Sequence, residues 1–157
     1  MDMRKRRITA MPKSSSEQAW LDLGRHALVE VTSEEDGYPI ESALLAEEDR
    51  GWRAATSGTQ IIRLIFDEPH KLERIWLLFD GVEETRTQEF ILRWSPSRND
   101  AFREIVRQQW NFSPSGSVRE IEDYSVELSE VAVLELIIVP DKSGGEARAC
   151  LRRFRLA

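Results

Sequence analysis

The chain has 157 residues, of which 41% are hydrophobic and 32% charged, a balance typical of one folded domain and not of a disordered chain. With 22 basic and 28 acidic residues its net charge is −6, which disfavours nucleic-acid binding by the surface as a whole. No apolar run approaches the roughly 20 residues of a membrane-spanning helix, so no membrane partner is expected. The single cysteine, Cys150, excludes an internal disulfide and fits a reducing compartment, which predicts a cytoplasmic protein.

The first residues, 1–16, have the composition of a flexible basic tail. Residues 4–7 are all basic, and the proline and serines that follow offer little to bury. We expect this cluster to be solvated; the alternative is a patch for nucleic acid or lipid. No apolar stretch follows it, as a secretory signal would require. A single domain is expected over residues 17–157, and it opens with a short helix that Ser16 caps and that ends at Gly24.

From residue 28 onward, short runs rich in strand-forming residues alternate with turn-forming residues. The clearest run is 87–95, where Phe90, Leu92 and Trp94 alternate with charged residues, so that one face is apolar. Many short strands of this kind favour an antiparallel sandwich or barrel. The expected strands are residues 28–32, 59–66, 72–79, 87–95, 118–128, 131–139 and 147–156, with a turn at 67–70 between the second and the third.

Residues 102–110 do not fit this pattern. The apolar residues Phe102, Ile105, Val106 and Trp110 recur at the spacing of an amphipathic helix. Periodicity alone therefore predicts a helix here. Because the remaining chain shows about seven strands and almost no long helical pattern, the overall prediction is all-β.

Landmark segments follow one another along the chain in a recognisable order. They are Gly51-Trp52-Arg53-Ala54-Ala55, Gln60-Ile61-Ile62-Arg63-Leu64, Leu72-Glu73-Arg74-Ile75, residues 88–95 with Asn99-Asp100 and Phe102-Arg103-Glu104, Leu134-Glu135-Leu136-Ile137-Ile138, and residues 149–154. In order and spacing they resemble the discoidin, or coagulation-factor C-type, domains of the galactose-binding-like superfamily, over roughly residues 28–156. The resemblance implies an eight-stranded jelly-roll sandwich, and it implies a strand instead of a helix at 102–110.

The chain departs from that family in two respects. Many members bind calcium through an aspartate–glycine pair after an Ala-Leu step and through a late glutamate. Here Ala43-Leu44 is followed by Leu45-Ala46, and the late position is near Arg153, so neither a metal site nor a cofactor is expected. The disulfide that joins the domain ends in extracellular members is also absent. The resemblance therefore implies an intracellular branch.

The resemblance places ligand-binding loops at one end of the barrel, here at residues 33–39, 45–52 and 80–86. A sugar site needs an aromatic plate together with charged groups that form paired hydrogen bonds with neighbouring hydroxyls. The candidate ligand-binding residues are therefore Asp36, Tyr38, Asp49, Arg50, Trp52, Glu84 and Arg86. The alternative for Trp52 is a place in the core, and for Arg50 and Arg86 it is simple pairing with acidic neighbours.

Few residues in the sequence form a pattern typical of a catalytic site. The chain has two histidines, His26 and His70, with no nucleophile motif, and a zinc site would need three or four nitrogen or sulfur ligands. Cys150 has apolar neighbours and is expected to be a small buried residue instead of a reactive thiol. The carboxylates at 47–49 and 83–84 are of the type that performs acid–base chemistry, but in exposed loops we expect them to be hydrated. The chain is therefore predicted not to be an enzyme.

These observations predict a non-catalytic ligand-binding module whose partner is a glycan or another small polar molecule. The alternative is an intracellular protein-interaction or scaffold domain, whose partner is a protein. An enzyme that uses a carboxylate pair is the weakest of the three hypotheses.

Overall fold

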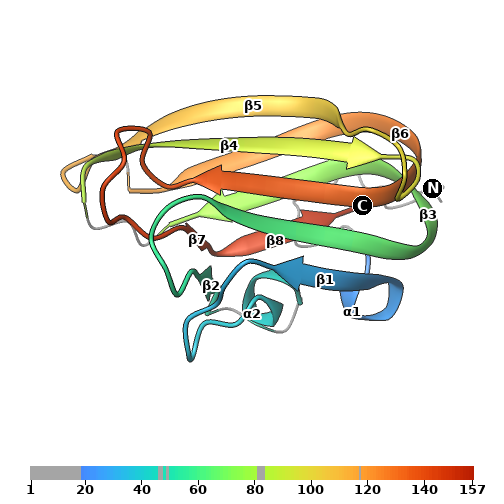
Figure 1. The fold of residues 1–157 in the computed structure, drawn as a ribbon, viewed down its shortest axis with the longest axis horizontal. Helices are drawn as coiled ribbons and strands as arrows, with labels where there is room; N and C mark the ends of the chain where they lie inside the picture. The colour runs from blue at the N-terminus through green and yellow to red at the C-terminus, as the bar shows by residue number, and fades with distance from the viewer. Residues whose placement is uncertain (1–18, 46–47, 49, 81–83, 117) are drawn as a thin grey trace, which may run out of the picture.

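The computed structural model describes residues 19–45, 48, 50–80, 84–116 and 118–157. The tail expected at residues 1–16 lies outside these ranges. The described chain is dominated by antiparallel strands, which confirms the all-β prediction (Figure 1). In chain order the elements are α1 (Leu23–His26), β1 (Ala27–Val31), α2 (Glu41–Leu44), β2 (Trp52–Arg53), β3 (Gln60–Phe79), β4 (Arg86–Ser95), β5 (Arg103–Phe112), β6 (Glu120–Val139), β7 (Cys150–Leu151) and β8 (Arg153–Leu156).

Two long strands, β3 and β6, form the centre of the structure. They pair antiparallel from Gln60 opposite Ile138 to Phe79 opposite Glu120. The first half of β3 also pairs with β1 and its second half with β8, while the second half of β6 pairs with β4, which in turn pairs with β5. The strand order is therefore β1-β3-β6-β4-β5, with β8 added to β3, and β2 and β7 form a separate short ribbon.

Both long strands curve round at the right-hand side of Figure 1, and the sheet thereby folds over itself into two layers. In β3 the register shifts three times between Ile65 and Arg74, a stretch that contains Pro69. The two layers face each other: the ring of Phe79, after the bend, lies 5.4 Å from the ring of Phe90 in β4. Because the strands double back, both ends of each of them lie at the same end of the sandwich, at the left of Figure 1.

The predicted turn at residues 67–70 was therefore wrong, because β3 continues through it. Proline has no backbone N–H to donate to a ladder, so the composition of this stretch is typical of a turn, yet Pro69 is accommodated where the pairing is already irregular. The two separate strands predicted at 118–128 and 131–139 are likewise one continuous strand, β6. The strand predicted at 147–156 is instead divided into β7 and β8.

Residues 103–110 belong to strand β5, and Phe102 directly precedes it, as the family resemblance implied and against the helical spacing. Gln108 pairs with Phe90 of β4, and Trp110 pairs with Gln88. The expected N-terminal helix is also different: α1 begins at Leu23, next to Gly24, instead of ending there. No helix within the described ranges is long and apolar enough to cross a membrane.

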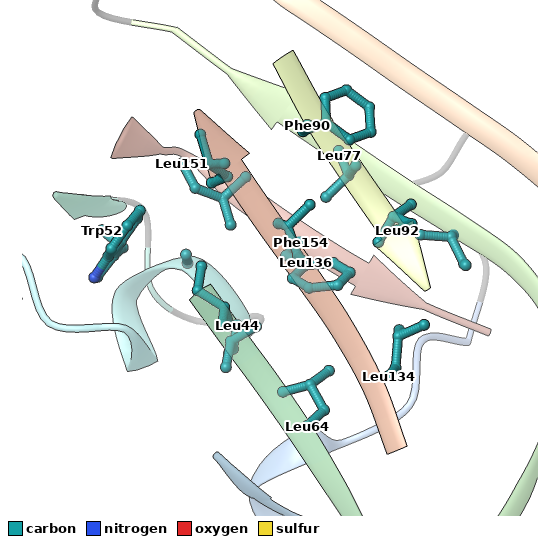
Figure 2. Close-up of a cluster of buried hydrophobic side chains, with 14 of the residues drawn as sticks. Leu44, Trp52, Leu64, Leu77, Phe90, Leu92, Leu134, Leu136, Leu151 and Phe154 are labelled. Carbon is teal, nitrogen blue, oxygen red and sulfur yellow. The ribbon is translucent and has the colours of Figure 1, made fainter. Parts of the chain in front are cut away.

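The core fills the space between the two layers (Figure 2). Leu64, Leu134 and Leu136 come from one half of the long strands, and Leu77 comes from the other half. Trp52 and Leu151, from the short ribbon, close the core at one end, beside Leu44 of α2. The described buried apolar side chains thus tie every element except β1 directly to one cluster, and this edge strand packs against it with half-buried residues.

One group of polar side chains is buried in this interior, near the start of β6. The Glu120 carboxyl group is fully buried and accepts a hydrogen bond from Gln88 Nε2 at 3.3 Å. Its second oxygen and Oε1 of Gln88 have no hydrogen-bond partner among the described residues. Burial first, and then the neighbouring carboxyl group of Glu122, raise the pKa of Glu120 from 4.5 to about 8. Glu120 is therefore protonated in the folded protein at neutral pH.

This raised pKa predicts that Glu120 makes the protein less stable as the pH rises. Between about pH 4.5 and pH 8 the unfolded chain releases the proton that the folded chain retains, so the free energy of unfolding falls with pH across that window and levels off above it. We expect Glu120→Gln to remove this part of the decline. Urea unfolding of the wild type and the variant across this pH window measures the decline in the free energy of unfolding.

Glu127→Gln, an exposed glutamate on the same strand, is the control and should decline as the wild type does. An equal decline in the Glu120→Gln variant would show that Glu120 is not protonated in the folded state.

Candidate functional site

A hollow of about 290 Å³ opens at the end of the sandwich where β2 and β7 lie. It is built by four parts of the chain: the turn that ends at Tyr38, the segment at 50–53, Asp80 just after β3, and the segment at 150–152. We call it the rim hollow. Its described lining consists of Tyr38, Arg50, Gly51, Trp52, Arg53, Asp80, Cys150, Leu151 and Arg152.

Tyr38 is held by a tight turn that is attached to β2. Its backbone N–H donates to the carbonyl of Glu35 at 2.9 Å, and Gly37 provides the positive φ of 87° within the turn. The turn then pairs with Arg53: Glu35 N–H donates to the Arg53 carbonyl at 2.8 Å, and Arg53 N–H donates to the Tyr38 carbonyl at 3.3 Å. The Tyr38 ring and the Arg53 side chain are thereby fixed next to each other.

Trp52 forms the buried base of the hollow. Its side chain belongs to the buried cluster of Figure 2 and is 1% exposed. Its indole Nε1 donates to the Ser33 carbonyl at 2.9 Å. Such burial fits the core alternative that the sequence left open for this residue. Trp52 therefore fixes the loop at 33–38 to the core and offers no open aromatic plate to a ligand.

The two strands of the short ribbon approach each other closely next to Trp52. Gly51 has a φ of 81°, and a Cβ atom at this position would lie 3.0 Å from both the Leu151 carbonyl oxygen and the Arg152 Cα. Both neighbours are backbone atoms, which cannot move aside as a flexible side chain can. Gly51 is thus needed both for its conformation and for its lack of a side chain.

The loop that leads to Arg50 is held from the far end of the chain. The guanidinium group of Arg155, in β8, is buried and donates to the carbonyl of Ala43 at 2.6 Å and to that of Leu45 at 3.1 Å. These carbonyls lie at the end of α2, where backbone acceptors have no partner within the helix. Arg155 satisfies them and anchors the start of the loop.

Positive charge predominates in the rim hollow. The guanidinium carbon of Arg53 lies 4.5 Å from the centre of the Tyr38 ring, within cation–π distance, and that of Arg50 lies at 6.0 Å, at the limit. Asp80 is the described acidic residue of the lining, and it pairs with Arg152 at 3.4 Å. The described lining thus contains three arginines and one carboxylate, and Glu35, just outside it, pairs with Arg53 at 3.5 Å. Guanidinium groups suit ligands with hydroxyl or carboxylate oxygens.

Arg86, a candidate from the sequence, lies behind the wall of the hollow and not in its lining. It is 5% exposed, and its guanidinium group donates to the Pro140 carbonyl and lies 3.8 Å from the Cys150 sulfur. Glu84, the other candidate in this loop, is exposed and lies 3.7 Å from Arg86. The alternative of pairing with an acidic neighbour thus fits Arg86. Burial raises the pKa of the Cys150 thiol, so this group is neutral.

The structure brings together Tyr38, Arg50 and Trp52 from the sequence-based candidates. Asp36 is exposed within the turn that Tyr38 closes, but it does not line the hollow, and Asp49 lies outside the described residues. Sequence reasoning missed the contributions of Arg53, Asp80 and Arg152. For Arg53 the sequence does hold a signal: side chains alternate along a strand, so the neighbour of the inward-pointing Trp52 is expected to point outward.

The two histidines lie elsewhere in the fold. The rings of His26 and His70 lie with their centres 5.1 Å apart and are tilted by 60°, next to Phe66 and the irregular stretch of β3. Within the described ranges, no three His, Cys, Asp or Glu side chains are grouped closely enough to hold a metal ion.

Comparisons with protein-family models and with curated protein sequences give no match. Solved structures are similar in fold. The family 32 carbohydrate-binding module of NanJ from Clostridium perfringens, in complex with galactose, has a TM-score of 0.64 and 10% identity, with 87% of this chain and 96% of that chain covered. The family 32 module of AlyQ, in complex with 4,5-unsaturated mannuronic acid, has a TM-score of 0.59 and 14% identity, with 84% and 95% covered.

Reduced XRCC1 bound to the DNA polymerase β catalytic domain is similar to the same degree. Its TM-score is 0.61 at 14% identity, and 85% of this chain and 95% of that chain are covered. At such low identity these matches show the fold alone. This chain therefore shares the β-sandwich fold of these domains, as the sequence resemblance implied.

The close approach at Gly51 predicts an unequal response of two glycines with the same backbone conformation. Gly58 also has a positive φ, of 85°, but a Cβ there would meet nothing within 4 Å. We expect Gly58→Ala to cost about 1–2 kcal/mol for the left-handed conformation alone. Gly51→Ala should cost at least about 1 kcal/mol more, because the ribbon must separate to admit the methyl group. Urea unfolding measures both, and equal losses would contradict the close approach.

Proposed function

We propose that the chain is a non-catalytic carbohydrate-binding module that holds one sugar ring in the rim hollow. The observation that carries this proposal is the convergence of the Tyr38 ring, the guanidinium groups of Arg50, Arg53 and Arg152, and the Asp80 carboxylate around one small concavity. An aromatic ring suits the apolar face of a sugar, and planar guanidinium groups donate paired hydrogen bonds to adjacent oxygens. The volume of about 290 Å³ is at the lower end of ligand pockets, which favours a single ring over a long chain.

The structural neighbours support this proposal at the level of the fold. Two of the domains that share the sandwich are described in complex with galactose and with an unsaturated mannuronic acid. A fold does not by itself fix a function, so the argument depends on the lining of the hollow.

The non-catalytic part of the proposal rests on the chemistry of the same residues. A hydrolase that acts on sugars uses two carboxyl groups, one of them protonated, on either side of the bond to be cleaved. Asp80 is the one carboxylate of the described lining, and Arg152 and Arg119 lie 3.4 Å and 3.6 Å from it. The neutral Cys150 thiol has no histidine beside it among the described contacts. Binding without turnover accounts best for this set.

Protein docking is the second candidate function, and the similarity to XRCC1 in its complex with a polymerase domain favours it. This second candidate function includes the cytoplasmic location expected from the sequence. The exposed large apolar residues of the described chain are Leu28 in β1 and, near the start of β6, Val118 and Ile121. These are too few to outline a contact surface as the rim hollow outlines a ligand site.

A glycan array with the wild type and two variants tests the proposed function. We expect Arg50→Ala and Tyr38→Ala to weaken binding of every retained glycan by about tenfold or more, since each removes one side of the hollow. Arg98→Ala, in an exposed turn at the other end of β4, is the matched control and should bind as the wild type does.

Silence of the wild type across the whole array would overturn the carbohydrate proposal and leave protein docking as the better candidate. Circular dichroism of each variant establishes that the losses do not come from unfolding.

A further inference from the structure

We propose that one outer face of the sandwich binds a second copy of this chain. The face belongs to the layer formed by β1, the first half of β3, the second half of β6, β4 and β5, on the side that points away from the core. We call it the ladder face, because charges of alternating sign cross it from strand to strand. None of the residues that carry the argument lines the rim hollow, so the contact does not depend on the proposed function.

The ladder face carries apolar side chains at positions that face water. An antiparallel sheet that packs one face on the core usually presents polar residues on the other. Here Ile137 of β6 lies between Ile61 of β3 and Ile91 of β4 in the register, and all three are half-exposed. They belong neither to the buried core cluster of the described chain nor to the residues that pack against it. Two residues further along the strands, the exposed Leu28 lies beside Ile65 in a second apolar row.

A row of charged side chains lies between these two apolar rows. The register places Glu30, Arg63, Glu135, Arg93 and Glu104 side by side on five neighbouring strands, so that their signs alternate. Arg63 Nε and Arg93 Nε donate to the Glu135 carboxylate at 2.7 Å and 2.6 Å, and Glu135 is fully buried beneath them. The end members stay accessible, since the side chains of Glu30 and Glu104 are 51% and 50% exposed. The remaining described charges on the outer side of these strands pair with one another and with the following turn; they are Glu89, Arg107 and Lys142.

A row of alternating charges is complementary to itself when one copy is turned over and shifted by one strand. A twofold axis that runs along the strands between β3 and β6 places β1 of one copy opposite β4 of the other, and β3 opposite β6. Glu30 then faces Arg93 of the second copy, and Ile61 faces Ile137, so that opposite charges and apolar side chains meet. An axis through β6 itself would place Arg63 opposite Arg93, which is a contact of like charges. The charge pattern thus selects the shifted arrangement, in which two sheets pack face to face with nearly aligned strands.

The size of the face predicts a reversible dimer. Five strands spaced about 4.8 Å apart span about 20 Å, which is small for a permanent interface, so we expect a dissociation constant above about 1 μM. Because the axis follows the strands, both copies carry their rim hollows at the same end. If the hollows bind sugars as proposed, one dimer presents two sites to the same surface and gains avidity from both.

Sedimentation velocity of the full chain, from about 1 μM to about 500 μM, tests the contact. We expect monomers at the low end and dimers at the high end, with less dimer as salt is added. Ile137→Asp should raise the dissociation constant at least about a hundredfold, because it buries a charge in the centre of the apolar row. Ile121→Asp, at the exposed isoleucine of the same strand in the other layer, is the control and should leave the constant unchanged.

The two end glutamates test the register of the contact. Each is half-exposed and pairs with one exposed arginine of its own face, Glu30 with Arg63 and Glu104 with Arg107. Glu30→Arg should weaken the dimer about tenfold, because it places like charges opposite each other, whereas Glu104 lies outside the overlap and Glu104→Arg should have no effect. An equal or larger loss in Glu104→Arg would overturn the arrangement.

Three further results would overturn the inference. The first is a wild-type chain that stays monomeric over the whole range. The second is a dimer that Ile137→Asp leaves intact, because it must use another surface. The third is a chain that dimerises only when residues 1–16 are removed, because that segment then occupies the face in the intact protein. Circular dichroism checks that each variant folds, and if Ile137→Asp does not, Glu30→Arg decides.

Discussion

The architecture depends on the pairing of β3 with β6. These strands stay in contact along their whole length, through a stretch of shifted register, and so contribute residues to both layers of the sandwich. A sheet that twists must curve or divide as it grows, and here the curvature is concentrated where Pro69 and the polar residues around it interrupt regular pairing. Because each strand returns to the end from which it began, the loops that connect the layers gather at that end, and the rim hollow is built from them.

The polar hollow stands on an apolar base. Trp52 and Leu151 belong at once to the core and to the lining, so the loops that carry Tyr38 and Arg50 are attached to the most tightly packed part of the molecule. Small ligand sites depend on such support, since a charged side chain on a mobile loop loses entropy when it binds. The Trp52 indole bond to the Ser33 carbonyl and the pairing of Glu35 with Arg53 are the contacts that provide it.

The sequence predicted the architecture better than it predicted the site. Alternation of apolar and charged residues identified β4 and most of β3 and β6, because these strands have one buried face. It failed at β5, where half-buried Ile105, Val106 and Trp110 on an edge strand happen to repeat at a helical interval, and order along the chain was the better guide. It failed again at Pro69, because composition cannot show whether an irregular stretch ends a strand or bends it.

For the site, the loops were identified but the roles within them were not. Tyr38 and Arg50, two of the predicted binding residues, line the hollow, whereas Arg86 turns inward, since the residue that opens a strand can face either side and only the register decides which. Arg152 could not be identified from its surroundings in the sequence, because it reaches the hollow only through the pairing of β7 with β2. The local sequence pattern therefore predicts where the loops lie, whereas the long-range strand pairing determines which of their side chains come together in the hollow.

Arg155 links the position of the loop at 45–50 to a strand more than a hundred residues away along the chain, and the separation of its contacts is 110 and 112 residues. A loop held in this way is not an independent unit. Transplanting residues 45–50 into a related sandwich would carry over their side chains without the cation that holds Leu45, where they begin. Recombination of this fold, by evolution or by design, would have to exchange the loop and the closing strand as one piece.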